Sequence, residues 1–236
     1  MKYLDKFFNK KKLERKANID VLERFIRMNW NLVSPGESKK NLENNLIEIM
    51  YSGDHLGNGL LITENGYFLT TRHCLINKFK NKIIKIQNGR AFNEYQICEE
   101  NIEDDLILAK LEYSKNFNPK IYNFYNTNVL QNIPFQLTTI KKGKIHKKYG
   151  LIDKRDYKKD EINSKNYFSI NNIGEPGDSG GILISPNGEL IGFEQGGMNN
   201  LTDRVIKING ALDLIYNYIN NLKKSKPLKP IQSINN

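Results

Sequence analysis

Short apolar runs separated by Asn-Gly pairs dominate the sequence from about residue 46 onward. Residues 59–63 (GLLIT) and 67–71 (YFLTT) flank Asn65-Gly66, and similar runs lie before Asn88-Gly89 and around Asn187-Gly188. Asn-Gly is the strongest local hairpin signal, because a type I′ turn needs a positive φ at both central positions. Further strand-like runs are residues 106–111, 135–140, 149–152, 167–170 and 205–208. Many short strands without helices between them predict an antiparallel β-sandwich or barrel.

Helical periodicity is confined to the two ends of the chain. After Asp20, which we expect to cap a helix, one apolar stripe is formed by Val21, Leu22, Phe25, Ile26 and Trp30. Residues 34–36 (SPG) then interrupt the pattern. A second stripe is formed by Leu212, Ile215, Ile219 and Leu222, and Pro227 and Pro230 follow its end. We therefore expect a helical N-terminal extension over residues 1–45 and a helix near the C-terminus.

The positive charge of the chain lies in its two tails. The formal net charge is +10, of which residues 1–16 contribute +5 and residues 221–236 contribute +4. A nucleic-acid-binding domain usually carries its basic groups on one folded face, so we expect solvated basic tails rather than nucleic-acid binding. A third lysine-rich stretch, residues 141–159, also carries acidic groups and indicates an exposed loop or hairpin.

The cysteine count and the N-terminus favour a cytoplasmic protein. Cys74 and Cys98 are the two cysteines of the chain, too few for a disulfide-dependent secreted domain, so we expect free thiols. The first 16 residues contain seven basic groups and no signal-like apolar run, and no segment approaches membrane-spanning length. Two cysteines and three histidines show no metal-ligand spacing, so we expect neither a metal nor another cofactor.

Residues 177–181 (GDSGG) form the most specific motif of the chain. A nucleophile on a tight turn needs neighbours without Cβ atoms, and a positive φ is cheap for glycine. Such a turn directs the amides of Gly177 and Ser179 toward one point, where they can stabilise a developing oxyanion.

A serine hydroxyl also needs a general base within reach. Of the histidines, His55 lies in an expected loop, His146 lies in the lysine-rich stretch and His73 follows a predicted strand.

Three segments resemble trypsin-like and HtrA-like serine peptidases. Residues 66–75 (GYFLTTRHCL) are similar to the segment that carries the catalytic histidine, and residues 105–111 (DLILAKL) to the strand that begins with the catalytic aspartate. Residues 173–181 (IGEPGDSGG) and 187–192 (NGELIG) look closer to HtrA-type than to trypsin sequences. The order of His73, Asp105 and Ser179 is that of chymotrypsin-like enzymes. Asp104, the neighbour of Asp105, fits the register less well.

The resemblance implies an all-β fold of two antiparallel six-stranded β-barrels, chymotrypsin-like, closed by the C-terminal helix. We expect the first barrel over residues 46–125, the second barrel and helix over 126–224, and a flexible basic tail over 225–236. It also implies a serine endopeptidase acting on protein or peptide substrates through a triad of His73, Asp105 and Ser179. The backbone of Gln195, Gly196 and Gly197 would then bind the substrate strand by β-addition.

Two positions depart from the family. Asp178 has no newly cut N-terminus to pair with, because no cleavage motif precedes the barrels; it must be solvated, hydrogen-bonded or matched by another cation. We therefore expect activity without proteolytic maturation. The pocket floor in the family corresponds to Ile173, which does not support trypsin-like specificity. Glu194 and Arg204 could each approach the pocket from its walls, and they indicate opposite preferences.

Two other function classes stay open. The same fold could be a silent or latent binding module that recruits a regulatory protein partner through residues 1–45, although an intact triad argues against this. A nucleic-acid-binding protein with basic tails is the weaker alternative, which salt-dependent retention by residues 1–16 would support. Burial of the N-terminal apolar stripe against the barrel is the simpler interpretation of the extension.

Overall fold

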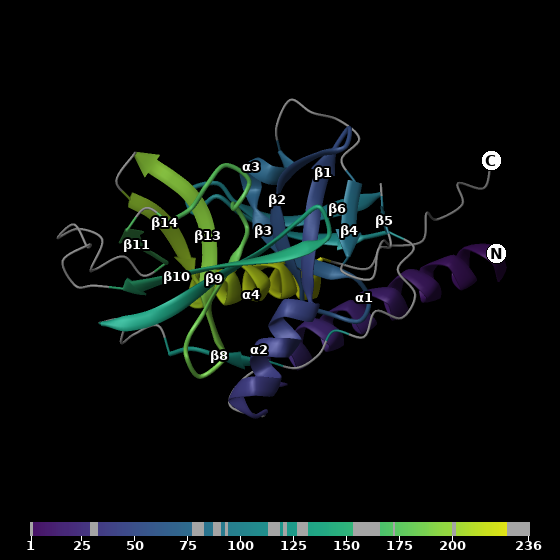
Figure 1. Ribbon diagram of the computed structural model, residues 1–236. Coiled ribbons are helices and arrows are strands. Elements are labelled where there is room, and N and C mark those ends of the chain that lie inside the picture. The colour runs from purple at the N-terminus through teal and green to yellow at the C-terminus, as the bar shows by residue number, and fades with distance from the viewer. Residues whose placement is uncertain are drawn as a thin grey trace.

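Two curled antiparallel β-sheets lie side by side, and two long helices pack against them (Figure 1). The computed structural model describes residues 2–28, 33–76, 83–86, 91–92, 94–112, 119, 122–126, 132–152, 166–171, 173–199 and 202–225. Statements below concern these residues. Trp30 and the predicted tail after residue 225 lie outside them.

The first sheet contains the strands of residues 46–111. Its members are β1 (Leu46–Tyr51), β2 (Asp54–Leu61), β3 (Tyr67–Thr71), β4 (Ile83–Ile86), β5 (Ala91–Phe92), β6 (Tyr95–Asn101) and β7 (Leu106–Leu111), in the order β5-β4-β1-β2-β3-β7-β6. The hairpin expected at Asn65-Gly66 is confirmed: β2 and β3 pair antiparallel, and Gly66 has a φ of +89°.

The second sheet contains strands from the C-terminal half. Its members are β8 (Asn123–Phe124), β9 (Ile133–Lys141), β10 (Lys144–Ile152), β11 (Tyr167–Asn171), β12 (Ile182–Ile184), β13 (Glu189–Asn199) and β14 (Thr202–Lys207). The main path runs β10-β9-β12-β13-β14-β11, and β8 pairs with β13. The described part of the lysine-rich stretch is the β9–β10 hairpin, so the hairpin alternative is confirmed there.

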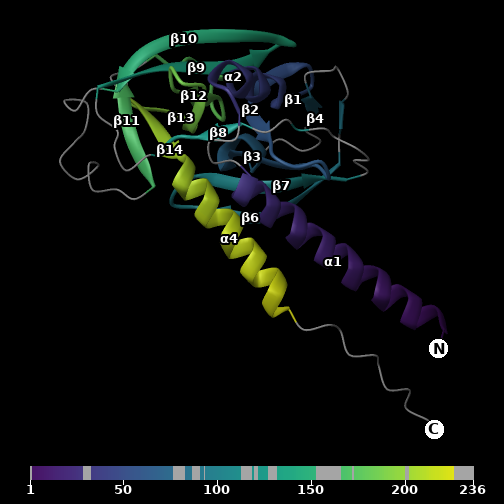
Figure 2. The same cartoon turned by 90° about the horizontal axis from the view of Figure 1, so that it is seen from below.

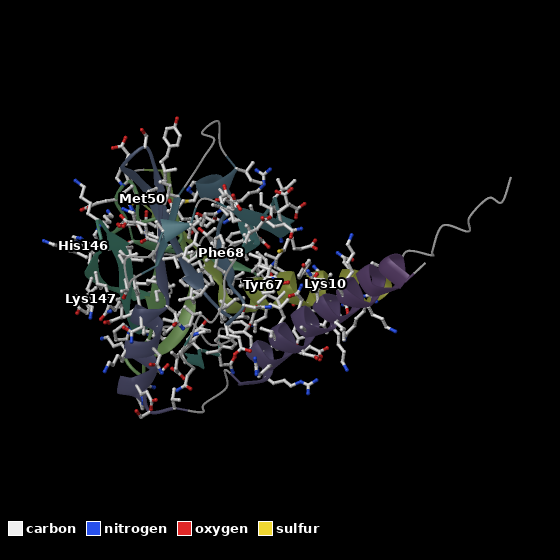
Figure 3. All side chains as sticks on the ribbon, turned by 90° about the vertical axis from the view of Figure 1, so that its right-hand side faces the viewer. Lys10, Met50, Tyr67, Phe68, His146 and Lys147 are labelled. Atoms are coloured by element: carbon white, nitrogen blue, oxygen red, sulfur yellow. The ribbon has the colours of Figure 1, made fainter. Side chains whose placement is uncertain are left out.

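Alternation along the strands divides the apolar side chains between three cores. On β3, Tyr67 and Leu69 enter a core shared by both sheets and the long helices, whereas Phe68 enters the interior of the first sheet. Figure 3 shows Tyr67 beside α4 and Phe68 within the β-structure. On β12, Ile182 and Leu183 divide in the same way between the shared core and the second sheet. Burial on both faces explains why these strands are continuous apolar runs.

Four helices complete the described fold: α1 (Lys2–Met28), α2 (Pro35–Asn44), the single-turn α3 (Arg72–Leu75) and α4 (Ile208–Lys224). The cap expected at Asp20 is wrong, because Asp20 lies inside α1. Residues 34–36 do separate two helices. The hydroxyl of Ser34 accepts a hydrogen bond from the Glu37 amide, and Pro35 occupies the first turn of α2, where its missing amide hydrogen costs nothing.

The apolar stripe of α1 packs against the β-structure. Leu22, Phe25 and Ile26 are buried in the shared core, and the Phe25 ring makes edge contacts with Tyr122 and Phe124. Figure 2 shows α1 and α4 running side by side and extending beyond the sheets. The simpler interpretation of the extension, burial against the barrel, is confirmed for these three residues.

The predicted fold class is confirmed, with a larger strand count. The first sheet has seven described strands, and the second has six on its main path plus β8. The predicted strand over residues 205–208 ends at Lys207, because Ile208 begins α4. Both cysteines are free thiols. Among the described helices, none combines the length and apolar character needed to cross a bilayer.

Candidate active site at the junction of the two sheets

The pairing of β3 with β7 brings His73 and Asp105 together. Thr71, the last residue of β3, faces Leu106, the first residue of β7. His73 follows the end of β3 and Asp105 precedes the start of β7, so both residues lie at the same edge of the sheet. Asp105 Oδ2 lies 2.5 Å from His73 Nδ1, and Asp105 Oδ1 accepts a hydrogen bond from the His73 amide at 2.9 Å. Both carboxylate oxygens therefore hold one residue, which fixes the orientation of the imidazole.

The contact with Asp105 changes the proton affinity of His73. The hydrogen bond to Asp105 raises the pKa of His73 well above its usual range, since the carboxylate favours the imidazolium. Burial alone would raise the pKa of Asp105, but the hydrogen bond from His73 lowers it on balance. The pair therefore stabilises a positive charge on the imidazole, as a histidine that accepts a proton during a reaction requires.

Asp105 and its neighbour Asp104 have different surroundings. Asp105 has a φ of +50°, which is uncommon for a non-glycine residue and turns its carboxylate toward His73. Asp104 is buried, and its Oδ2 accepts hydrogen bonds at 2.7 Å from the side-chain amides of Asn101 and Asn166. The structure thus pairs His73 with Asp105 and gives Asp104 a role in holding the turn.

The turn that carries Ser179 is built from glycines at positions where a side chain cannot fit. Gly177 and Gly180 have φ angles of +92° and +78°. A Cβ on Gly180 would lie 1.9 Å from the Asn58 carbonyl oxygen, and one on Gly177 would lie 2.7 Å from the His55 ring. The Gly180 amide donates to Glu194 O at 2.7 Å, which holds the turn against β13. The glycines of the motif are therefore required by the backbone path.

Asn58, on β2, joins the Ser179 turn to the first sheet. Its backbone amide donates to Ser179 O at 2.7 Å, and its side-chain amide donates to Gly177 O at 2.9 Å. Cys74, the residue after His73, has its sulfur 3.9 Å from Ser179 O. The Ser179 hydroxyl donates to Gln195 O at 3.3 Å. Ser179 thus lies where β2, α3 and β13 meet, next to the segment that carries His73.

Two lysines of the β9–β10 hairpin balance the buried carboxylate of Asp178. Asp178 is 1% exposed. Lys148 Nζ donates to its Oδ2 at 2.7 Å, and Lys141 Nζ lies 2.9 Å from Oδ1 in an ionic contact without hydrogen-bond geometry. The Glu175 amide also donates to Oδ2, at 2.8 Å. Of the alternatives for Asp178, the structure shows internal cations and a backbone hydrogen bond.

His55 was missed as a functional candidate, and the expected loop around it is wrong. It lies on β2, where Nδ1 is 3.0 Å from Glu48 Oε1 and Nε2 is 2.7 Å from Gly177 O. These two contacts, one to each ring nitrogen, fix the orientation of the His55 ring between β1 and the Ser179 turn. Gly177 is 122 positions away along the chain, and no local pattern indicates this contact.

A basic pocket opens beside Gly177. Its volume is about 440 Å³, and its lining residues are His55, Lys141, Lys142, Lys144, His146 and Pro176. His146 and Lys147 project from the outer edge of the β-structure in Figure 3. Of the three histidines, His73 and His55 therefore lie near the Ser179 turn, and His146 lies exposed at the rim of this pocket.

The residues predicted to shape the pocket separate into two groups. Glu194, on β13, is fully buried beside the Ser179 turn, and Gly197 faces Asp203 of β14. Arg204 faces Gly196 across the β13–β14 ladder, and its guanidinium lies 3.9 Å from the centre of the Tyr167 ring. Ile173 packs against the core of the second sheet. Glu194 and Arg204 both lie on strands next to the Ser179 turn, and which of them shapes a substrate pocket stays a prediction.

Comparison with known proteins supports the fold. No family model and no curated protein sequence matches the chain. Among solved structures, the chain is similar to one described as "HtrA-type protease AlgW with decapeptide", with a TM-score of 0.63 and 15% identity. The match covers 80% of this chain and 68% of that chain. The similarity, together with the two curled antiparallel sheets, shows a chymotrypsin-like fold.

Proposed function

We propose that the protein is a serine endopeptidase, with Ser179 as nucleophile, His73 as general base and Asp105 as the residue that orients His73. The observation that carries the proposal is the two-point contact of Asp105 with His73 next to the Ser179 turn. A histidine held at Nδ1 by a carboxylate keeps Nε2 available for proton transfer. Structural similarity to an HtrA-type protease solved with a decapeptide supports a peptide as the substrate.

In this mechanism the Ser179 hydroxyl attacks the scissile carbonyl as His73 Nε2 takes its proton, and His73 then returns the proton to the leaving amine. The 3.3 Å hydrogen bond from Ser179 Oγ to Gln195 O is long. We expect substrate binding to exchange it for a bond to His73 Nε2, because catalytic hydrogen bonds often tighten in the complex.

The amides of Gly177 and Ser179 are the donors that would stabilise the oxyanion. His55 and Asn58 hydrogen-bond to the carbonyl oxygen of Gly177. This carbonyl belongs to the peptide group between the Gly177 amide and the Ser179 amide, so the contacts hold the segment that carries both donors. A donor fixed in advance needs no reorganisation during the reaction, which is the source of its effect on rate. The backbone of Gln195, Gly196 and Gly197 would bind the substrate strand by β-addition.

Lys141 and Lys148 support activity of the unprocessed chain. In enzymes that need a cut, the new N-terminus supplies a cation for the aspartate before the serine. Here two lysine ammonium groups already contact Asp178. We therefore expect the full-length protein to be active without trimming.

Labelling by a fluorophosphonate probe tests the proposal. We expect covalent labelling of the intact full-length protein, and no labelling of the Ser179→Ala and His73→Ala variants. Intact mass of the labelled protein shows whether trimming preceded activity. Absence of labelling in a folded wild-type protein would favour the catalytically silent binding module.

A further inference from the structure

The β9–β10 hairpin gathers basic side chains on one face beside the Ser179 turn. Lys144, His146 and Lys148 alternate along β10, so their side chains share one face of the sheet. Lys141, on β9, faces Lys144 across the ladder. Lys148 lies at the inner end of this face and contacts the Ser179 turn. The other three line the basic pocket of about 440 Å³ at its outer end.

Three basic side chains of this pocket are unpaired. Lys142, Lys144 and His146 are exposed, and their side chains make no ion pair or hydrogen bond within the residues that the structure describes. Lys147, on the opposite face of β10, instead contacts Glu43 Oε1 at 2.7 Å. Positive charges held close together without an acidic partner attract an anion. The pocket face of the hairpin therefore has a charge that this part of the chain does not neutralise.

The carboxylate of Glu48 is buried behind the hairpin turn and already has partners. The amides of Lys142 and Gly143 donate to its two oxygens at 2.6 and 3.2 Å, and His55 Nδ1 lies 3.0 Å from Oε1. The Glu48 side chain is 1% exposed, and it forms no ion pair with a lysine of the described chain. Glu48 therefore fixes the turn and the His55 wall of the pocket without pairing with the pocket lysines.

The size and the charge of the pocket indicate the ligand. A volume of about 440 Å³ lies within the range of small-molecule sites, roughly 300–1,000 Å³. A nucleic-acid backbone is bound by an extended row of cations rather than by one pocket. A lysine ammonium group binds phosphate as a point charge, and each phosphate group carries about −1.5 to −2 at neutral pH. Several lysines in one pocket therefore favour a small molecule with several phosphate groups.

We propose that the basic pocket binds a small oligophosphate through Lys141, Lys142 and Lys144. The shared chemistry of the ligand is a chain of phosphate groups, either as an inorganic oligophosphate or as part of a nucleotide. The site lies on the side of the Ser179 turn formed by β2, β9 and β10, whereas the proposed substrate strand pairs with β13. Binding in this pocket requires no catalysis, so it does not depend on the proposed function.

The pocket is in direct contact with the Ser179 turn. Lys141 Nζ lies 2.9 Å from Asp178 Oδ1, and His55 Nε2 lies 2.7 Å from Gly177 O. A bound oligophosphate places negative charge beside the Gly177 and Ser179 amides, which are the proposed oxyanion donors. Like charges repel, so we expect the bound anion to slow reactions at Ser179. This consequence, unlike the binding itself, rests on the proposed function.

The first test measures binding by calorimetry. Tripolyphosphate is titrated into the full-length protein in a buffer without phosphate or divalent cations. We expect binding that Lys142→Gln and Lys144→Gln each weaken by about tenfold, because each removes one charge from the pocket. Lys147→Gln is the matched control, with the same change of charge on the opposite face of β10, and it should change the affinity by less than about twofold. Unchanged melting temperatures without ligand show that the variants are folded.

Further ligands identify the source of the phosphate groups. Tighter binding of ATP than of tripolyphosphate supports a nucleotide, and the reverse order supports an inorganic oligophosphate. A peptide of four glutamates that binds as tightly as tripolyphosphate overturns the phosphate class. Absence of tripolyphosphate binding overturns the proposal. Equal affinity of the wild type, Lys142→Gln and Lys144→Gln also overturns it, because the ligand then lies on another basic surface.

The second test measures the effect on Ser179. Fluorophosphonate labelling is followed at about three times the wild-type Kd of tripolyphosphate, which fills most wild-type sites and a minority of sites in Lys144→Gln. We expect labelling of the wild type to slow by about twofold or more, and labelling of Lys144→Gln to slow less, relative to sodium chloride of equal ionic strength. An unchanged wild-type rate overturns the inhibitory effect and leaves the binding site standing. Calorimetric binding without labelling of either protein supports the pocket and contradicts the peptidase proposal.

Discussion

Lys148 Nζ lies 2.7 Å from Asp178 Oδ2, so a lysine on the β9–β10 hairpin neutralises the buried carboxylate next to Ser179. The same ammonium donates to Ile173 O at 3.0 Å and contacts Glu175 at 3.3 Å. One lysine therefore joins the hairpin to the segment before the serine and to the serine turn itself. Lys148 lies on β10, which ends at Ile152, more than 20 positions before Ser179 in the sequence. The conformation of the Ser179 turn is therefore supported by a strand that is distant in the chain.

Replacing Lys148 should weaken both the fold and the reaction. Lys148→Met removes one of the two cations that contact the buried carboxylate of Asp178. We expect a loss of about 2 kcal/mol in the free energy of unfolding. This is less than the roughly 3–5 kcal/mol expected when a buried ion pair is fully broken, because Lys141 still contacts Asp178. Urea unfolding measures the loss, and fluorophosphonate labelling measures the effect on Ser179. Lys148→Arg keeps the charge and should retain most of both. Unchanged labelling in Lys148→Met, and in the double variant with Lys141→Met, would contradict a role of these lysines in ordering the turn.

The contribution of Asp178 to stability has a defined pH direction. Burial alone would raise the pKa of Asp178, but the hydrogen bond from Lys148 and the ionic contact with Lys141 lower it on balance below its usual value. A carboxyl group with a lowered pKa in the folded state stabilises above its unfolded pKa and loses that contribution as pH falls through its folded pKa. We expect urea midpoints to fall below about pH 4, and to fall less steeply in Lys148→Met.

The Asp105→Asn variant tests the orientation of His73. We expect kcat/KM of the wild type to rise with pH as His73 loses its proton, because the general base must be neutral. Since the hydrogen bond to Asp105 is the main cause of the raised pKa of His73, the midpoint should move to lower pH in Asp105→Asn. The plateau should fall by roughly 10³ to 10⁴-fold. Asp104→Asn is the matched control, and an equal pH shift there would contradict the pairing.

His55 should act by positioning Gly177. We expect His55→Gln to lower kcat by about tenfold or more with a smaller change in KM, because a displaced oxyanion donor acts on the transition state. His146→Gln, in the same basic pocket but exposed, is the control and should leave kcat unchanged. A purely structural role of His55 would appear as a lower melting temperature with kcat per labelled site unaffected.

The N-terminal helix should contribute to stability through one face. Phe25 is 6% exposed and packs on Tyr122 and Phe124, so Phe25→Ala should cost about 3 kcal/mol in the free energy of unfolding. Leu13 is 68% exposed, and Leu13→Ala should change that energy by less than about 0.5 kcal/mol. Thermal and urea unfolding of the two variants measure the difference. Equal stability of both variants would contradict docking of α1 on the β-structure.

Most of the strands and the Ser179 turn could be predicted from local sequence, whereas His73 and Asp105 were predicted from the resemblance to serine peptidases. Asn65-Gly66 marks the β2–β3 hairpin, and the residues 177–181 motif requires glycines whose φ angles are positive in the structure. The cap at Asp20 failed because the polar residues before it continue the helix, and tertiary contacts of Leu22, Phe25 and Ile26 anchor that helix. His55 was placed in a loop because Gly53-Asp54 before it resembles a turn, which in the structure belongs to the β1–β2 hairpin.

The amino-acid sequence by itself determined the strand-rich fold, the helical ends and Ser179 as a candidate, because hairpin turns and glycine-rich motifs are local properties of the chain. His73 and Asp105 became candidates through the resemblance of residues 66–75 and 105–111 to trypsin-like and HtrA-like peptidases. Tertiary structure alone decided how Asp178 is neutralised and which residues hold the Gly177 carbonyl. Each of these depends on strand register between distant segments: one residue of shift moves a side chain to the opposite face of its sheet. Asp203 and Arg204 are adjacent in the chain, yet one carboxylate lies beside Glu194 and the neighbouring guanidinium lies on Tyr167.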